Sequence, residues 1–257
     1  MLGMAKNVQK KVKKVVDTPL RLWNSLVTHG NIQIQNNMRT KTLLAAASML
    51  AAGLASSMAQ SNVYSLNVVG YVNTALTAGG RYNSVANPLN TANNVFSNVL
   101  AGVPNNSQVL KWNHAIVDFT VINKTPFGTW SPAGSETTTL NPGEGVLVRA
   151  GSPATNTFVG EVLQGTLTTV FPAGYEMRAS QVPEANTVTA LGLTATIPGN
   201  SQLLKWDSSL GTIGDWVVFN RTPFNTWSPS EPSLGVGEPF LLKAASAFNW
   251  VRNFTVQ

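Results

Sequence analysis

Two glutamates stand at equivalent places in a sequence that repeats itself, and paired carboxylates can hydrolyse glycosidic bonds. Glu144 lies in the segment 141–145, Asn-Pro-Gly-Glu-Gly, and Glu238 lies in the corresponding segment 235–239, Gly-Val-Gly-Glu-Pro. Glycosidases place two carboxyl groups roughly 5–10 Å apart, so a glycosidase built on this pair is one hypothesis. The simpler interpretation is that each glutamate belongs to a polar turn and binds backbone N–H groups or solvent, because glycines are typical of turns.

Other residue types that catalysis needs are scarce after residue 59. His114 is the only histidine there, Ser208 replaces it in the second copy, and no Gly-x-Ser-x-Gly motif supports a triad of His114 with Asp118. The chain has no cysteine, so thiolate chemistry is excluded. Neither a calcium-type carboxylate loop nor a phosphate-binding glycine loop is present. We therefore expect a protein that is not an enzyme and that uses no metal and no cofactor.

Tryptophans are the side chains best suited to a ligand, because the apolar C–H faces of sugar rings stack on flat indoles. Trp130 and Trp227 occupy equivalent places in the repeated loop Thr-Pro-Phe-x-Thr-Trp-Ser-Pro. In a carbohydrate-binding module these indoles would stack on a polysaccharide, and neighbouring polar side chains would bind its hydroxyl groups. Those neighbours are Asn123, Lys124, Asn220 and Arg221. The alternative is that each indole closes the end of a β-core.

Nearly everything after residue 60 is written twice, at a spacing of about 95 residues. The segments 106–113, 123–132 and 140–145 return as 200–207, 220–229 and 234–239. Each copy must form the same supersecondary unit. We expect β-repeat 1 over residues 60–160 and β-repeat 2 over residues 161–257, joined without a flexible linker into one pseudo-twofold body.

The composition predicts an all-β fold. Val and Thr are abundant, Asn, Gly, Pro and Ser recur about every ten residues, and no long amphipathic helical pattern follows residue 60. Strands are expected at 64–72, 81–86, 108–112, 119–123, 145–149 and 157–162, and at 176–180, 202–206, 216–220, 239–243 and 250–256. A short helix or turn is expected at 93–100 and at 186–193. The predicted architecture is a β-sandwich or a barrel-like body, in which the last strand of the first copy can double as the first of the second.

Residues 38–59 have the pattern of a signal peptide. Arg39 and Lys41 precede the apolar stretch 43–55, and Ser57-Met58-Ala59 has the small-x-small form of a cleavage site. Residues 1–37 then form an N-terminal extension, interpreted as an over-extended start, with a surface-bound amphipathic helix as the alternative. We expect export to the extracellular space, the cell surface or the periplasm, and no membrane span in the mature chain.

Cleavage would change the charge of the protein. The whole chain carries a formal charge of +6, but the part after residue 59 holds nine basic and ten acidic residues. The excess of positive charge therefore belongs to the leader, and nucleic acid is not an expected partner.

Three motifs resemble an uncharacterised family of secreted bacterial β-repeat proteins of the kind found in Verrucomicrobia. These motifs are 63–72 (Val-Tyr-Ser-Leu-Asn-Val-Val-Gly-Tyr-Val), 86–90 (Ala-Asn-Pro-Leu-Asn) and 142–145 (Pro-Gly-Glu-Gly). The resemblance implies export and a repeated β-fold, and it brings no established activity. The leading hypothesis is a non-enzymatic structural or interaction protein of the cell surface or envelope, which self-associates through sheet edges or binds other envelope proteins. A carbohydrate-binding module is the main alternative.

Overall fold

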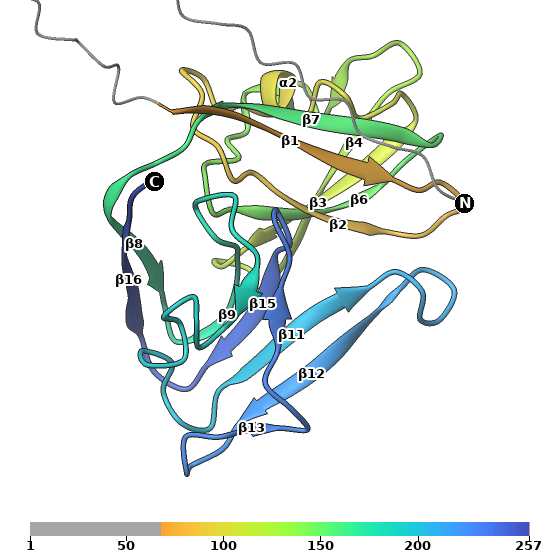
Figure 1. Ribbon diagram of the computed structural model, residues 1–257. Helices are drawn as coiled ribbons and strands as arrows, with labels where there is room; N and C mark the ends of the chain where they lie inside the picture. Colours follow the sequence, from red (N-terminus) through yellow and green to blue (C-terminus); the bar gives the residue numbers. More distant parts are fainter. Residues whose placement is uncertain (1–67, 257) are drawn as a thin grey trace, which may run out of the picture. The chain divides into compact units, whose positions relative to one another are not determined.

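The part of the chain that the computed structural model describes, residues 68–256, is built almost entirely of antiparallel β-sheets (Figure 1). The predicted all-β class is thereby confirmed. These residues belong to one unit that spans residues 64–257. The predicted signal peptide at 38–59 and the extension at 1–37 lie outside the described residues.

The first half contains seven strands and two short helical turns. They are β1 (Val69–Leu76), β2 (Asn83–Ala86), α2 (Phe96–Val99), β3 (Ser107–Asn113), β4 (Asp118–Lys124), β5 (Trp130–Ser131), the 3-10 turn η1 (Ser135–Thr137), β6 (Gly145–Arg149) and β7 (Ala154–Glu161).

The second half contains nine strands. They are β8 (Gly165–Phe171), β9 (Gly174–Arg178), β10 (Asn186–Thr187), β11 (Gln202–Asp207), β12 (Asp215–Arg221), β13 (Trp227–Ser228), β14 (Ser233–Leu234), β15 (Phe240–Ala244) and β16 (Phe248–Phe254).

Each half has a five-stranded sheet, and the strand orders of the two sheets correspond. The order is β2-β6-β3-β4-β5 in the first half and β9-β15-β11-β12-β13 in the second. A two-stranded ribbon accompanies each sheet, β1-β7 in the first half and β8-β16 in the second, and β10 pairs with β14. The strands β5 and β13, which follow the repeated loop, therefore occupy corresponding edges of the two sheets.

One hydrophobic core lies within each half. In the first, Val109 and Val148 of the sheet share a cluster with Leu76 and Phe158 of the ribbon and with Phe96 of α2. Side chains alternate between the two faces of a strand, so one face of the sheet is covered by the ribbon and the helix. This arrangement is sandwich-like.

The core of the second half also joins its sheet to its ribbon. Leu203 and Leu242 of its sheet cluster with Phe171 and Trp250 of the β8-β16 ribbon. Trp250 is 1% exposed, and its Nε1 donates a hydrogen bond to the Leu191 carbonyl oxygen at 2.9 Å. The ribbon therefore anchors both the sheet and the turns that follow β10.

A third cluster joins the halves. It contains Leu147 from the first sheet and Leu241 and Met177 from the second, together with Tyr82 just before β2. Leu147 follows Val146 and precedes Val148 in β6, and both of those valines belong to the first core, so the period of two turns Leu147 to the opposite face. The two sheets therefore meet through the faces that their ribbons leave uncovered.

Reciprocal hydrogen bonds also connect the halves. Trp112 Nε1 donates to the Tyr175 carbonyl oxygen at 3.0 Å, and Trp206 Nε1 donates to the Tyr82 carbonyl oxygen at 2.8 Å. The backbone makes a similar exchange, from Ala179 N to Gly143 O at 2.8 Å and from Ala86 N to Gly237 O at 2.9 Å. Equivalent residues of the two copies thus contact the opposite half.

The expectation of a shared strand at the junction is wrong. β7 pairs with β1, whereas β16 pairs with a separate strand, β8, that the sequence interpretation missed. Residues 69–72 of β1 and residues 158–161 of β7 are partners in one antiparallel ladder, where Tyr71 lies opposite Val159. Of the two uncertain segments, 93–100 contains α2, whereas 186–193 contains β10 followed by turns.

Candidate functional site

The loop between β4 and β5 holds a phenylalanine in solvent. Thr125 N donates to the Thr129 carbonyl oxygen at 2.8 Å, and the hydroxyl oxygens of these threonines are 2.7 Å apart. Gly128 has a φ of +79°, which a glycine adopts without a Cβ penalty. At the tip, Phe127 is 89% exposed. Because the loop is closed by its own hydrogen bonds, the aromatic ring projects from it.

The loop between β12 and β13 has the same construction. Thr222 N donates to the Thr226 carbonyl oxygen at 2.8 Å, and the two hydroxyl oxygens are again 2.7 Å apart. Asn225 takes the left-handed position with a φ of +60°, a conformation that asparagine tolerates better than most residues. Phe224 at the tip is 88% exposed.

These two phenylalanines are residues that the sequence interpretation overlooked. Burying a phenylalanine is worth about 1.5–3 kcal/mol, so two rings held in water forgo a substantial stabilisation. The available signal was a large apolar residue directly after the proline of a turn, present in both copies of the loop. For the neighbouring tryptophans, Trp130 and Trp227, the sequence left two interpretations: rings that face a ligand, or rings that close the end of a β-core.

Trp130 instead belongs to the first core. It is 8% exposed, and its ring centroid lies 5.6 Å from that of Phe96. Lys124 Nζ lies 5.4 Å from the centroid of the indole and donates to the Val103 carbonyl oxygen at 2.7 Å. Burial lowers the pKa of Lys124. Trp130 therefore closes the end of the core, with an ammonium group over its ring.

Trp227 is half-buried and has a cation of its own. The Arg221 guanidinium carbon lies 5.5 Å from the indole centroid, and Arg221 is only 5% exposed. The Arg221 side chain donates to the carbonyl oxygens of Asn225 and, at 3.2 Å, Thr194, whose hydroxyl accepts a bond from Trp227 Nε1 at 3.2 Å. The guanidinium therefore lies over the indole and is held there by hydrogen bonds to two carbonyl oxygens.

The two asparagines of the predicted site do not join these tryptophans. Asn123 and Asn220 are exposed and accept hydrogen bonds from Gln108 at 3.2 Å and Gln202 at 2.9 Å, on the adjacent strands. Successive side chains of a strand point to opposite faces. The structure therefore brings together each cation and its tryptophan, and places each asparagine on the other side of its strand.

A hollow of about 690 Å³ opens beside Trp130, within the roughly 300–1,000 Å³ range of ligand pockets. Lys124, Glu136 and Thr129 contribute polar groups to its wall. Small residues form most of the remaining lining, namely Ser97, Ala101, Gly128, Ala133 and Gly134. The second half carries Arg221 and Asn225 where the first has Lys124 and Gly128, so bulkier groups stand at the corresponding place.

The two glutamates close their own turns. Glu144 Oε2 accepts a bond from Asn141 N at 2.7 Å and lies 3.2 Å from Lys111 Nζ. Glu238 Oε2 accepts from the equivalent Gly235 N at 2.7 Å, and its Oε1 lies 3.0 Å from Lys205 Nζ. This is the geometry that the turn interpretation predicts.

His114 lies in a cluster of charges that bridges the halves. Its Nδ1 is 3.3 Å from Glu176 Oε2, and Arg178 Nη1 is 3.0 Å from Glu176 Oε1 and 3.9 Å from Glu144 Oε1. Glu176 is 6% exposed, and burial raises its pKa. His114 and Glu144 come from the first half and Glu176 and Arg178 from the second, so the Glu144–Arg178 ion pair and the His114–Glu176 contact both cross the junction.

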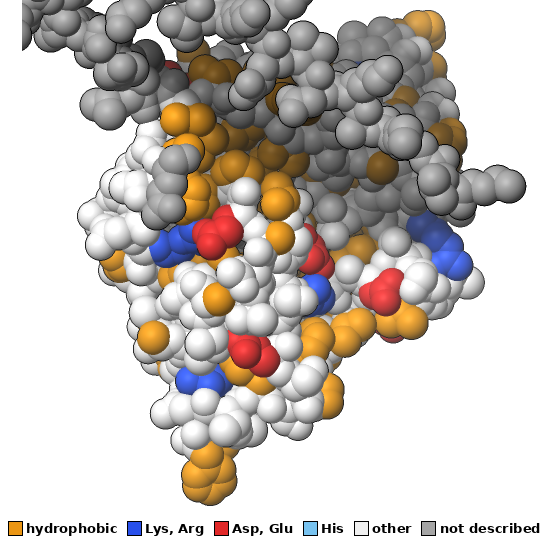
Figure 2. Space-filling model, viewed as in Figure 1, with side chains coloured by type: hydrophobic (Ala, Val, Ile, Leu, Met, Phe, Trp, Pro, Cys, Tyr) orange, Lys and Arg blue, Asp and Glu red, His pale blue; other side chains and the backbone are white. Residues whose placement is uncertain are grey.

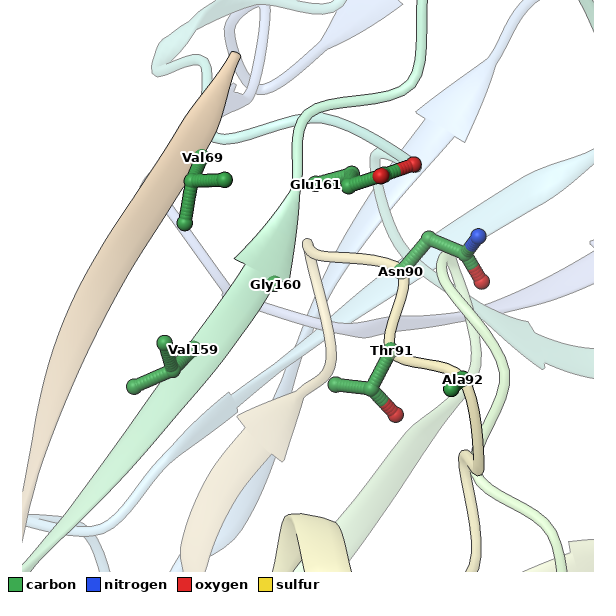
Figure 3. A pocket seen from close by; sticks show the side chains of 7 residues that line it. All are labelled: Val69, Asn90, Thr91, Ala92, Val159, Gly160 and Glu161. Atoms are coloured by element: carbon green, nitrogen blue, oxygen red, sulfur yellow. The ribbon is translucent and has the colours of Figure 1, made fainter. Parts of the chain in front are cut away.

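Another hollow, of about 380 Å³, lies against the β1-β7 ribbon (Figure 3). Val69 on β1 and Val159 on β7 flank it, and the loop 90–92 closes the other side. Asn90 and Glu161 hold the loop to β7 through two backbone hydrogen bonds of 2.8 and 2.7 Å. The walls of this hollow are therefore partly apolar, from the two valines, and partly polar, from Asn90, Thr91 and Glu161.

Within residues 68–256, no group of three or more His, Cys, Asp and Glu side chains is arranged to hold a metal ion. Among the helices of the same region, none has the length and hydropathy needed to cross a membrane. Comparisons of the chain with protein-family models, curated proteins and solved structures give no significant match.

Proposed function

We propose that this protein is an exported, non-enzymatic structural or interaction module of the cell surface or envelope, which associates with other macromolecules, including its own copies. The observation that carries the proposal is the pair of phenylalanines, Phe127 and Phe224, at 89% and 88% exposure. An interface gains most from aromatic anchors that become buried on binding. Two such anchors on self-closed loops suit repeated attachment.

The proposal includes a duplicated body with pseudo-twofold symmetry, as the resemblance to secreted β-repeat proteins implies. The corresponding strand orders and the reciprocal bonds of Trp112 and Trp206 support it. A duplicated body offers two similar attachment points from one gene product. Such bivalency increases avidity without requiring a stronger single contact.

Strand edges offer a second means of association. β5 and β13 are two residues long and end their sheets, and in the described sheets β1 and β8 each pair with one ribbon partner. Edge strands present unpaired backbone groups to neighbouring chains. Short edges limit indiscriminate pairing, which leaves the loop tips as the more specific anchors.

Sedimentation velocity of the purified protein over a wide concentration range tests the proposal. The expected result is a sedimentation coefficient that rises with concentration, and N-terminal sequencing of the same material is expected to begin near Gln60. A sedimentation coefficient that stays at the monomer value, with no partner retained from an envelope extract, would contradict the association. An intact N-terminus at Met1 would contradict export.

Carbohydrate binding is the second candidate, and the hollow beside Trp130 favours it. A sugar placed there would meet Lys124, Glu136 and the accessible edge of the indole. Tryptophan fluorescence titration with polysaccharides, after a glycan-array screen, would detect it. Binding that persists in Lys124→Met, or no response to any glycan, would refute this candidate. The glycosidase hypothesis lacks comparable support, because each glutamate is bound within its own turn.

A further inference from the structure

We infer that Phe224 of one copy inserts into the hollow beside Trp130 of a second copy, so that the protein assembles head to tail. The inference rests on the proposed function and names its partner, a second copy of this chain. It follows from a projecting ring and a hollow of suitable chemistry on the same molecule.

The projecting element is the β12-β13 loop. Phe224 is 88% exposed, and the Thr222–Thr226 bonds close the loop behind it. Figure 2 shows a hydrophobic knob at the lower tip of the described unit, where Figure 1 draws the chain beside β13. Because the backbone of the loop is already closed by these bonds, docking requires little further ordering of the loop, which favours binding.

The receiving element is the hollow of about 690 Å³ beside Trp130. Its volume exceeds that of a phenylalanine side chain, and Ala101 and Ala133 give it apolar walls. Aromatic rings associate edge to face at centroid separations of about 4.5–7 Å, so the Trp130 indole supplies a matching surface. Lys124 adds an ammonium group that is attracted to the face of an incoming ring.

The contact is heterologous, because the ring and the hollow belong to different loops. The first half has Lys124 and Gly128 at the places where the second has Arg221 and Asn225, and the Arg221 guanidinium is bound to the carbonyl oxygen of Thr194 at 3.2 Å. The hollow adjoins the β4-β5 loop of the first half, whereas Phe224 is on the β12-β13 loop of the second half. Two different surfaces meet in each contact.

The positions of these surfaces determine the form of the assembly. β5 and β13 end their respective sheets, while the sheets meet through the cluster of Leu147 and Leu241. Knob and hollow consequently belong to different halves of the unit, away from the junction. A heterologous contact that does not close by rotation forms an open chain of copies.

The contact is expected to be weak. One side chain and the rim of a hollow bury less than the ~1,200–2,000 Å² of a standard stable interface. Assembly should therefore be reversible and appear at high protein concentration, as on a crowded surface.

Complementary variants of the whole protein test the inference in sedimentation velocity experiments. Phe224→Ser removes the knob, and Ala133→Glu places a carboxylate in the hollow at an exposed position. Each variant alone is expected to remain monomeric at concentrations where the wild-type average mass exceeds twice that of the monomer. A one-to-one mixture retains one intact knob and one intact hollow, so it should form dimers that do not grow further.

Ile116→Ser is the control, because Ile116 is an exposed apolar residue, at 60%, on the turn between β3 and β4. It should assemble as the wild type does, and far-UV circular dichroism should show the same fold for all variants. Wild-type assembly that survives Phe224→Ser would overturn the knob-in-hollow contact and leave the proposed function standing. Loss of assembly in Phe127→Ser but not in Phe224→Ser would also overturn it. A wild type that stays monomeric would overturn self-association altogether.

Discussion

Replacing Trp206 with phenylalanine should weaken the junction between the halves more than the equivalent change at Trp112. Trp206 Nε1 donates to the Tyr82 carbonyl oxygen at 2.8 Å, and Tyr82 is 8% exposed. Trp112 Nε1 donates to the Tyr175 carbonyl oxygen at 3.0 Å, but His114 Nδ1 also lies 3.2 Å from that oxygen. The Tyr175 carbonyl therefore keeps a partner when Trp112 is changed.

The expected loss of unfolding free energy in each variant follows from the contacts that it keeps and the hydrogen bond that it loses. Both variants retain a ring next to the neighbouring aromatic, since the indoles of Trp112 and Trp206 each stand edge to face at 5.1 Å from Phe119 and Trp216. A net hydrogen bond contributes about 0.5–1.5 kcal/mol, and a buried carbonyl left without a partner costs about 1–3 kcal/mol. We expect a loss of about 2–3 kcal/mol for Trp206→Phe and about 1 kcal/mol for Trp112→Phe.

Urea unfolding followed by far-UV circular dichroism measures both losses, and it does not depend on tryptophan emission. The free energy in water comes from linear extrapolation, with m-values compared to verify that the unfolded states are alike. Equal losses, or a larger loss for Trp112→Phe, would refute the argument that the His114 contact compensates at Tyr175. No loss in either variant would show that the reciprocal bonds do not stabilise the junction.

Two further perturbations follow from the packing and charge of single residues. A Cβ at Gly160 would lie 2.4 Å from the Asn90 carbonyl oxygen, so Gly160→Ala should destabilise the protein by about 1–3 kcal/mol. Gly199→Ala, whose Cβ would meet no atom closer than 3.5 Å, is the control, and similar melting temperatures for the two would contradict the clash. Because burial raises the pKa of Glu176, the folded state binds that proton more tightly than the unfolded chain, and stability should fall as the pH rises from about 4.3 through the folded pKa. Urea unfolding of wild type and Glu176→Gln over that range should show the wild type losing stability relative to the variant; the opposite slope would argue against a raised pKa.

Local patterns in the sequence predicted most strands well. The strand predicted at 145–149 is β6. The strand predicted at 202–206 is β11, which extends one residue further, to Asp207. β8 was missed because its residues, 165–171, have little identity to those of β1, the corresponding ribbon strand. The similarity between the two copies, which indicated other strands, therefore gave no indication of β8.

The candidate site was less predictable, because its exposure depends on distant residues. Phe127 lies in the loop before β5 and Trp130 is the first residue of β5, three positions later, yet the indole is buried and the phenyl ring is exposed. Phe96, which contacts Trp130, belongs to a helix more than thirty residues earlier. No periodicity within the loop could indicate which aromatic ring that helix would cover.

The sequence by itself predicted the all-β class and the turn positions of Glu144 and Glu238, because these depend on spacing and on the preferences of neighbouring residues. The tertiary structure decided that Phe127 and Phe224 face water, that a hollow opens beside Trp130, and that His114 meets Glu176 across the junction. Each of these features is a contact, or the lack of one, between segments far apart in the chain. Burial depends on all the elements that surround a side chain, whereas strand and turn propensity depends on its immediate neighbours.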